Sequence, residues 1–457
     1  MKKVWLVVAL VALGGLTSKT FADVQNIRIS GDIRIRGYFL DSAGVAASEG
    51  GDAQDNSNAS FISQRTRVSV EADLEDHVLV VVTLKAEGLW GDNNLNSADS
   101  GAGSEQSSGA INRRWDVGVT EAYVQFNELF YTPATLKLGR QYLHYGRGLI
   151  ISSTEQEYNY DAARLVLDYY PLTIDLVGAM LVNQQGFSAF RSDAGAKDLL
   201  FLNARYELSD SAIKDVEMYF GWVSNNGIDG TPFGGVSRVP PSVFGASPLI
   251  IGLRSDMNLT EGLQTWVEGA YEFGADGTAG ANISAFLFNL GGRYTLKDVQ
   301  WAPVFNATYT FASGGGKDGE ASIFRPWFDY VDGYNGYLFA PSLSNINIFN
   351  LGASVKPYEN TTLSLQGYYY LKADHDSPAG SNANVDFGGL GIVPDGISSD
   401  IGWELDAILG YDYSKDVRMQ LVYGVFLPGS AFKSDKGSSV EMARAAEEVR
   451  AELNVKF

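Results

Sequence analysis

Apolar and polar residues alternate in short segments along nearly the whole chain. The first segment begins at Asn26, where isoleucines fall on one face and Arg28, Asp32, Arg34 and Arg36 on the other. This separation follows because successive side chains of a β-strand point to opposite sides. An apolar row backed by a charged row is typical of a transmembrane strand. We therefore expect a strand here whose charged side chains face a water-filled lumen.

The same pattern predicts about eighteen strands, each long enough to cross a bilayer when tilted. The fold class expected is all-β, a transmembrane antiparallel β-barrel. The expected strands lie near 27–39, 61–74, 78–90, 116–127, 133–140, 161–170, 172–183, 199–208, 215–225, 249–258, 263–274, 284–296, 300–312, 346–356, 361–373, 401–413, 416–426 and 447–457.

Short and long connections alternate between these segments. The short ones fall at 75–76, 170–171, 297–298, 357–360 and 414–415. The long ones fall at 40–60, 91–114, 141–160, 184–198, 226–248, 275–283, 313–345, 374–400 and 427–446. Outer-membrane barrels have short periplasmic turns and long extracellular loops. The alternation therefore favours such a barrel over a soluble β-sandwich.

The two ends of the chain agree with this location. Lys2 and Lys3 precede an apolar run, 4–13, that is too short to span a bilayer, and Ala22 closes a small-residue cleavage site. We predict a signal peptide over 1–22 and a single outer-membrane barrel domain over 23–457. The last alternating segment ends on an aromatic residue, Phe457. The predicted location is the outer membrane of a Gram-negative bacterium.

Composition narrows the function. Loss of three lysines with the signal peptide would take the formal charge from −20 to −23, which argues against a nucleic-acid partner. There is no cysteine, and the histidines at 77, 144 and 375 have no metal-ligand spacing. No Gly-x-Ser-x-Gly segment is present. We expect no cofactor and no enzyme activity.

Strand phase assembles a large set of arginines on the inward rows. A ring of arginines selects for anions, but Asp32 and other inward acids are nearly as numerous, so the same residues could form a cross-strand charge ladder. For the group we favour a role in permeation. The candidate pore-lining residues are Arg28, Arg34, Arg36, Arg65, Arg67, Glu121, Arg140, Arg147, Arg164, Arg205, Arg254 and Arg293.

Two loops stand out. Loop 313–345 is the longest and the richest in aromatic residues, Phe324, Trp327, Tyr337 and Phe339 among them. It could fold inward and narrow the pore, stack on sugar rings, or pack on itself outside the rim, and we favour the external arrangement. In the last loop, residues 438–447 have high helix propensity and predict a short helix.

Several segments resemble the alginate export family of outer-membrane porins. They are Glu121-Ala122-Tyr123-Val124, Leu138-Gly139-Arg140-Gln141-Tyr142-Leu143-His144-Tyr145-Gly146, Tyr160-Asp161-Ala162-Ala163-Arg164-Leu165, Phe324-Arg325-Pro326-Trp327-Phe328, Trp403-Glu404-Leu405-Asp406 and Tyr423-Gly424-Val425-Phe426-Leu427-Pro428-Gly429. The resemblance implies a monomeric eighteen-stranded barrel with an arginine-lined, anion-selective constriction, and it makes Arg140 and Glu121 candidate constriction residues. One departure is Thr120, which stands where a dedicated alginate exporter would have arginine.

These expectations converge on a passive channel for anionic or sugar-like solutes, with alginate-type polyuronate export implied by the resemblance. The expected partners are outer-membrane lipid, a small anionic solute or anionic oligosaccharide, and periplasmic export factors. The alternatives are a non-selective general porin, or a plugged barrel that acts through its surface loops.

Overall fold

The structure is a computed structural model. It describes residues 24–41, 59–91, 115, 117–153, 159–182, 197–209, 211–225, 247–275, 282–315, 320–324, 327, 335–341, 343–374, 398–432 and 445–457. The predicted signal peptide, 1–22, lies outside the described residues, so it stays a prediction.

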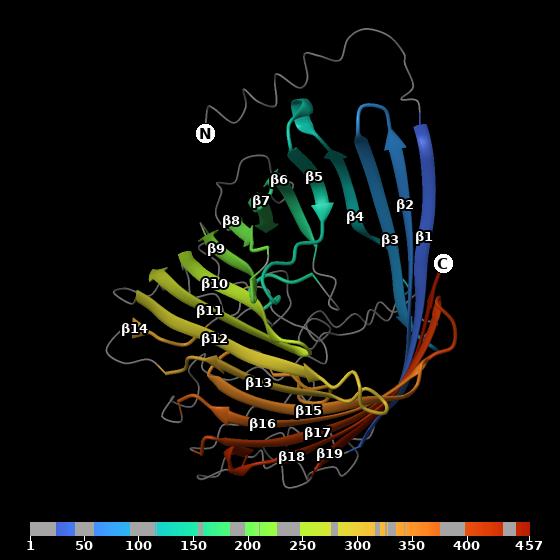
Figure 1. Ribbon diagram of the computed structural model, residues 1–457, viewed down its shortest axis with the longest axis vertical. Coiled ribbons are helices and arrows are strands. Elements are labelled where there is room, and N and C mark those ends of the chain that lie inside the picture. The colour runs from blue at the N-terminus through green and yellow to red at the C-terminus, as the bar shows by residue number, and fades with distance from the viewer. Residues whose placement is uncertain are drawn as a thin grey trace, which may run out of the picture.

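Eighteen long antiparallel strands form one closed sheet (Figure 1), as the alternation predicted. Their bounds are β1 (Val24–Asp41), β2 (Ala59–Leu74), β3 (Val78–Leu89), β4 (Val117–Phe126), β5 (Ala134–Gln141), β6 (Tyr160–Tyr169), β7 (Leu172–Val182), β8 (Lys197–Glu207), β9 (Ile213–Asn225), β10 (Ser247–Thr260), β11 (Leu263–Ala275), β12 (Asn282–Thr295), β13 (Val304–Ala312), β15 (Ile346–Tyr358), β16 (Thr361–Lys372), β17 (Asp400–Asp412), β18 (Val417–Pro428) and β19 (Ala446–Lys456). A two-residue piece, β14 (Glu320–Ala321), pairs in parallel with the start of β12.

The sheet closes where β1 pairs with both β2 and β19. Two backbone hydrogen bonds join Gly31 and Phe457 at this seam. The Gly31 N–H donates to the Phe457 carbonyl at 2.8 Å, and the Phe457 N–H donates to the Gly31 carbonyl at 3.0 Å. A side chain at Gly31 would have no room, because a Cβ there would lie 2.7 Å from the Phe457 ring. The terminal aromatic residue therefore packs on the strand that completes the barrel.

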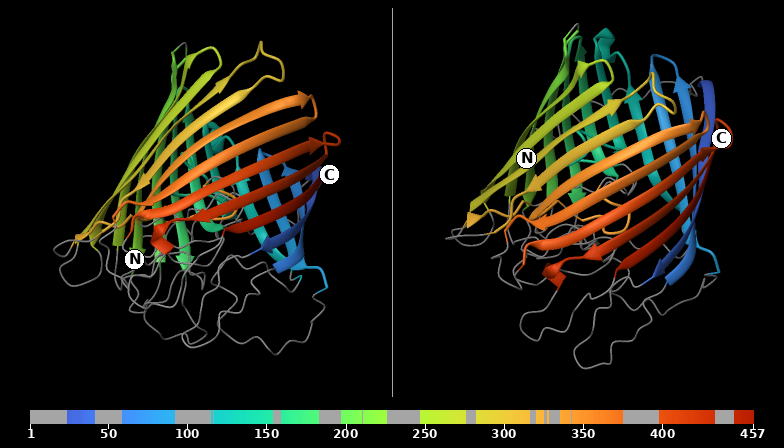
Figure 2. Two further views of the ribbon diagram at one scale, coloured as in Figure 1. Left: turned by 90° about the horizontal axis from the view of Figure 1, so that it is seen from below. Right: turned by 60° about the horizontal axis from the view of Figure 1, so that its bottom comes forward.

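The short turns gather at one end of the tilted strands (Figure 2). Only two residues separate β6 from β7, β10 from β11 and β15 from β16, whereas the connections after β1, β3 and β9 are long. One expected strand starts later than predicted, at Val304 rather than 300, because Trp301 and Ala302 have positive φ angles within a turn. Among the described residues, no helix is long and apolar enough to cross a bilayer.

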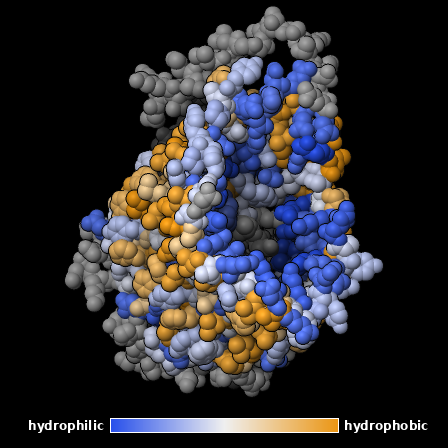
Figure 3. Space-filling model, in the orientation of Figure 1, coloured by the Kyte–Doolittle hydropathy of each residue, from blue (hydrophilic) through white to orange (hydrophobic). Residues whose placement is uncertain are grey.

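The two faces of the wall differ in chemistry. The outward rows carry exposed apolar side chains such as Ile29, Leu351 and Leu365, each about two-thirds exposed, whereas the inward Asp32 and Arg65 are buried. In Figure 3 hydrophobic residues gather on the outside of the wall and hydrophilic residues surround the opening. This is the pattern of a barrel that meets lipid outside and water inside.

Two segments fold into the barrel and pack on the inward face of its wall. Residues 142–153 follow β5 and bury Leu143, Tyr145 and Ile151. Tyr145 packs on Phe201 of β8, with 4.7 Å between the ring centres. The apolar core therefore lies inside the barrel, where these loops narrow the lumen.

The described part of loop 313–345 is the second inward segment. Phe339 stacks on Phe426 of β18 with 4.4 Å between ring centres, and Trp327 donates a hydrogen bond to the inward Glu272. The preference for a self-packed external loop was wrong for these residues. Lumen-facing rings on β16 and β18 offer the loop an apolar surface inside the barrel, a pairing that local sequence does not reveal.

The helix expected at 438–447 lies mostly outside the described residues. Its last two positions, Ala446 and Glu447, belong to β19 instead. They pair with Phe426 and Val425 of β18. Pairing with β18 therefore makes these two residues part of a strand despite the helix propensity of the segment.

Candidate functional site

The arginines of β1 and β2 lie on the inward face, and most make ion pairs. Arg28 bonds to Glu71 and Asp73, with its shortest contact at 2.7 Å, and Arg36 bonds to Glu452. The buried Asp32 carboxylate receives Arg65 at 3.1 Å and Arg67 at 2.7 Å. Arg34 is buried on the same row. This part of the predicted arginine cluster forms a cross-strand charge ladder.

The ladder continues through β6 to β10. Arg164 bonds to Asp175 at 2.6 Å, Arg205 to Asp215 at 2.6 Å, and Arg254 to Glu217 at 2.6 Å. Each arginine is held by a carboxylate on a neighbouring strand, which fixes the side chain along the wall. Such paired arginines present less net charge to a passing solute than a free guanidinium does.

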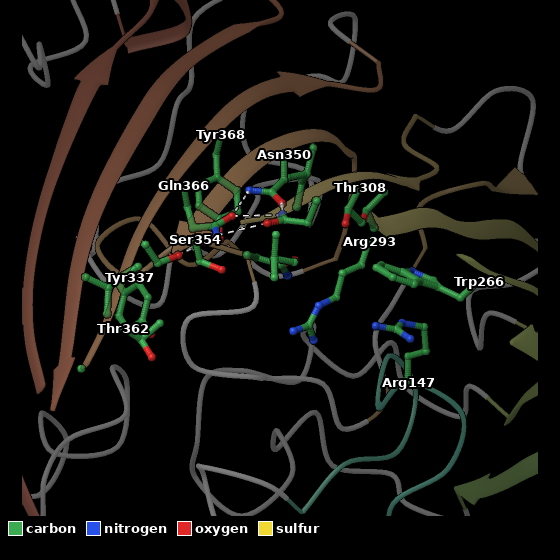
Figure 4. Close-up of a pocket in the computed structure, with 18 of the residues that line it drawn as sticks. Arg147, Trp266, Arg293, Thr308, Tyr337, Asn350, Ser354, Thr362, Gln366 and Tyr368 are labelled. Atoms are coloured by element: carbon green, nitrogen blue, oxygen red, sulfur yellow. Dashed lines mark hydrogen bonds between the residues drawn. The ribbon is translucent and has the colours of Figure 1, made fainter. Parts of the chain in front are cut away.

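Arg293 differs from the others. It lies on the inward row of β12, and it forms no ion pair with any residue that the structure describes. Its side chain extends into a cavity of about 440 Å³ (Figure 4). A guanidinium has five donors in a planar fork that suits a carboxylate. Arg293 is therefore the arginine best placed to bind an anion.

Arg147 reaches the same cavity from the inward segment 142–153. Its guanidinium carbon lies 4.0 Å from the centre of the Trp266 ring, and Nη1 lies 3.8 Å from Asp256. The backbone of Arg147 is fixed as well, because its N–H donates to Glu268 at 2.9 Å. The side chain and backbone contacts together hold this charge at the cavity.

Neutral amide side chains form another wall of the cavity. Asn306 donates to Asn350 at 2.8 Å and to Gln366 at 3.1 Å, so β13, β15 and β16 are bridged (Figure 4). Tyr337, from the second inward segment, lies on the side opposite Arg147 (Figure 4). Our sequence reasoning missed this wall, although uncharged polar residues at the inward positions of these three strands mark it.

Two residues suggested by the resemblance have different positions. Glu121 is on the inward face, where its carboxylate accepts a hydrogen bond from Thr83 at 3.1 Å. Arg140 is on the outward row with Leu138, and it bonds to Asp161 at 2.8 Å. Arg140 is therefore not a constriction residue in this structure. The shift follows from strand phase, because Gly139 and Gln141 occupy the inward positions of β5.

Comparison with known proteins defines the family. A family model described as alginate export matches residues 26–446. The chain belongs to the alginate export family. It is an outer-membrane channel of the Gram-negative envelope and not an enzyme. No curated protein sequence matches the chain.

Three solved structures share the fold of this family member at low identity. OccAB1 of Acinetobacter baumannii is 12% identical with a TM-score of 0.57, and the match covers 97% of this chain and 99% of that chain. OprD of Pseudomonas aeruginosa is 11% identical with a TM-score of 0.55 and coverage of 95% and 96%. OccK2 (OpdF) of P. aeruginosa, solved in complex with glucuronate, is 10% identical with a TM-score of 0.54 and coverage of 96% and 99%.

Proposed function

We propose that this channel passes anionic, sugar-like solutes of the uronate type, and that Arg293 supplies the charge that attracts their carboxylates. One observation carries the proposal: Arg293 has no ionic partner among the described residues and faces the cavity beside a neutral amide wall. A guanidinium suits a carboxylate, and amides can both donate to and accept from hydroxyl groups. The glucuronate bound to the fold relative OccK2 is a solute of this class.

Membership in the alginate export family extends the proposal to uronate oligomers and to export. We further propose that the channel works as a monomer, as the family resemblance implies, and no second chain is needed to close the lumen. Periplasmic export factors would be needed only to deliver the uronate polymer to the end of the barrel where the short turns lie. The mass of the detergent-solubilised protein, measured by light scattering, tests the monomer.

The transport proposal is tested by single-channel recording of refolded protein in planar bilayers, with glucuronate or an oligouronate as blocker. Wild type should prefer anions, and Arg293→Ala should weaken block by about tenfold, as expected for loss of a charged hydrogen bond. Arg205→Ala is the matched control, because it removes the same charge from an arginine already paired with Asp215.

Equal loss of block in both variants would assign the effect to total lumen charge and overturn the role of Arg293. Current without ion preference and without block would instead identify a general porin. A protein that folds but passes no current would indicate a plugged barrel that acts through its loops.

A further inference from the structure

Both inward segments are attached to the barrel wall by buried carboxylates. In the first, the Gly146 N–H donates to Glu217 at 3.0 Å and the Arg147 N–H donates to Glu268 at 2.9 Å. The Tyr219 hydroxyl donates to the other oxygen of Glu268 at 2.9 Å. Glu268 is fully buried. Its two carboxyl oxygens therefore accept hydrogen bonds from the loop backbone and from one tyrosine.

The second segment repeats the arrangement on the opposite side of the cavity. Glu404 of β17 accepts the N–H groups of Tyr337 at 2.7 Å, Leu338 at 2.9 Å and Phe339 at 2.9 Å. The Tyr370 hydroxyl adds a contact at 3.2 Å. Consecutive backbone N–H groups that converge on one anion form a nest. Here the group bound by the nest is a carboxyl side chain of the wall, and the nest belongs to the loop.

A glycine makes the close approach in each loop. Gly146 has φ +58° and Gly336 has φ +113°, conformations that other residues rarely adopt. A Cβ at Gly146 would lie 2.5 Å from Glu268 Oε1, and one at Gly336 would lie 2.7 Å from Glu404 Oε1. Each loop can therefore reach its carboxylate only with glycine at this position.

The residue after each glycine lines the cavity. Arg147 and Tyr337 are fixed by their backbone N–H groups while their side chains enter the cavity from opposite sides (Figure 4). We infer that Glu268 and Glu404 are positioning residues that set the width and chemistry of the constriction through these two loops. This inference depends on the proposed function only in the measurement of uronate block. The conductance measurements test it independently.

Detachment of a loop would break these hydrogen bonds and expose the apolar side chains that the loop buries, such as Leu143 and Phe339, which is unfavourable. The loops should therefore stay attached in the native channel. Weakening a carboxylate anchor should raise the population of the detached state by about tenfold or more. A detached loop removes its cavity-lining residue and widens the path, so the channel should flicker to larger conductance.

The test combines two kinds of variant. Glu268→Gln and Glu404→Gln keep the side-chain shape and replace one acceptor oxygen by an NH₂ group, which cannot accept a hydrogen bond. Gly146→Ala and Gly336→Ala keep every charge and block the close approach. Gly269→Ala is a matched control beside Glu268, since its Cβ would have no atom closer than 3.8 Å. Glu207→Gln removes a half-exposed acid next to Arg205 and controls for lumen charge.

We expect both Gly→Ala variants and both Glu→Gln variants to show more frequent large-conductance openings, whereas the two controls match wild type. Heat-modifiable gel mobility reports whether each variant has formed the barrel. If both folded Gly→Ala variants keep wild-type conductance and noise, the positioning role is overturned. If wild type itself is not blocked by glucuronate, the uronate proposal fails, while the conductance comparison still tests the anchors.

Discussion

The Arg147 guanidinium lies over the Trp266 ring, with 4.0 Å between its central carbon and the ring centre. Such a contact contributes about 0.5–2 kcal/mol. Trp266→Leu should therefore weaken glucuronate block roughly two- to thirtyfold. Trp266→Phe keeps a ring face, so its block by glucuronate should be weaker than that of wild type and stronger than that of Trp266→Leu. Block titrations in planar bilayers measure the effect, and Trp403→Leu on the outward face is the control. Unchanged block in Trp266→Leu would show that the ring does not orient Arg147.

Asp32 separates two guanidinium groups inside the wall, so its removal should destabilise the barrel. Asp32→Ala would leave the charges of Arg65 and Arg67 without the carboxylate between them, at a cost of about 3–5 kcal/mol. Asp73→Ala removes one partner from the half-exposed pair with Arg28 and should cost under about 1 kcal/mol. Urea unfolding in lipid vesicles, followed by tryptophan fluorescence, compares the two. Similar losses in both variants would contradict the ladder role of Asp32.

A charged substitution on an outward row should destabilise the barrel. Leu351 is 69% exposed in the middle of β15, on the face that meets lipid. Leu351→Arg should cost about 2–4 kcal/mol of folding free energy near the bilayer midplane. Ser354→Arg on the inward row of the same strand should cost less, because water fills the lumen. The same urea titration measures both variants, and an equal cost would contradict the assignment of faces.

His144, in the first inward segment and outside the strands, should make that loop sensitive to acid. Burial lowers the pKa of His144 below its ordinary value of 6.5, and the charges of Arg254 and Arg147 act in the same direction, while Glu217 opposes them. The inward loop therefore binds a proton less readily than a detached loop does. Its stability should fall as pH drops below about 6.5.

The measurement is single-channel noise at pH 7.5 and pH 5.5. Wild type should become noisier at the lower pH, and His144→Gln, which cannot titrate there, should change less. An equal response in both proteins would assign the pH dependence to other groups.

Strand positions and faces were accessible from sequence because both follow from a two-residue period. Ile29 outside and Arg28 inside are set by alternation alone, and the same holds for β17 and β19. Arg140 shows where the approach fails, since a family motif suggested an inward position that strand phase does not give. The phase follows from the alternation along β5, which places Arg140 on the same face as Leu138, and a motif carries no information about it.

The inward loops were harder to predict. Their positions depend on contacts between residues far apart in the chain, such as Tyr337 with Glu404 and Gly146 with Glu217. Nothing in the local pattern distinguishes Glu404 from the acids of the charge ladder. A glycine before an aromatic or basic residue, as at Gly146 and Gly336, is only a weak sign of such an anchored loop. It can be interpreted only when the carboxyl group that faces it is known.

The seam between β1 and β19 also constrains how the barrel can form. Arg36 pairs with Glu452, which lies 416 positions further along the chain, and Gly31 pairs with Phe457. Both edge strands therefore keep unpaired backbone groups until the end of the protein has arrived, and such edges invite pairing with other chains. Because the seam joins the first strand to the last, the sheet can close into a barrel only after β19 has paired with β1.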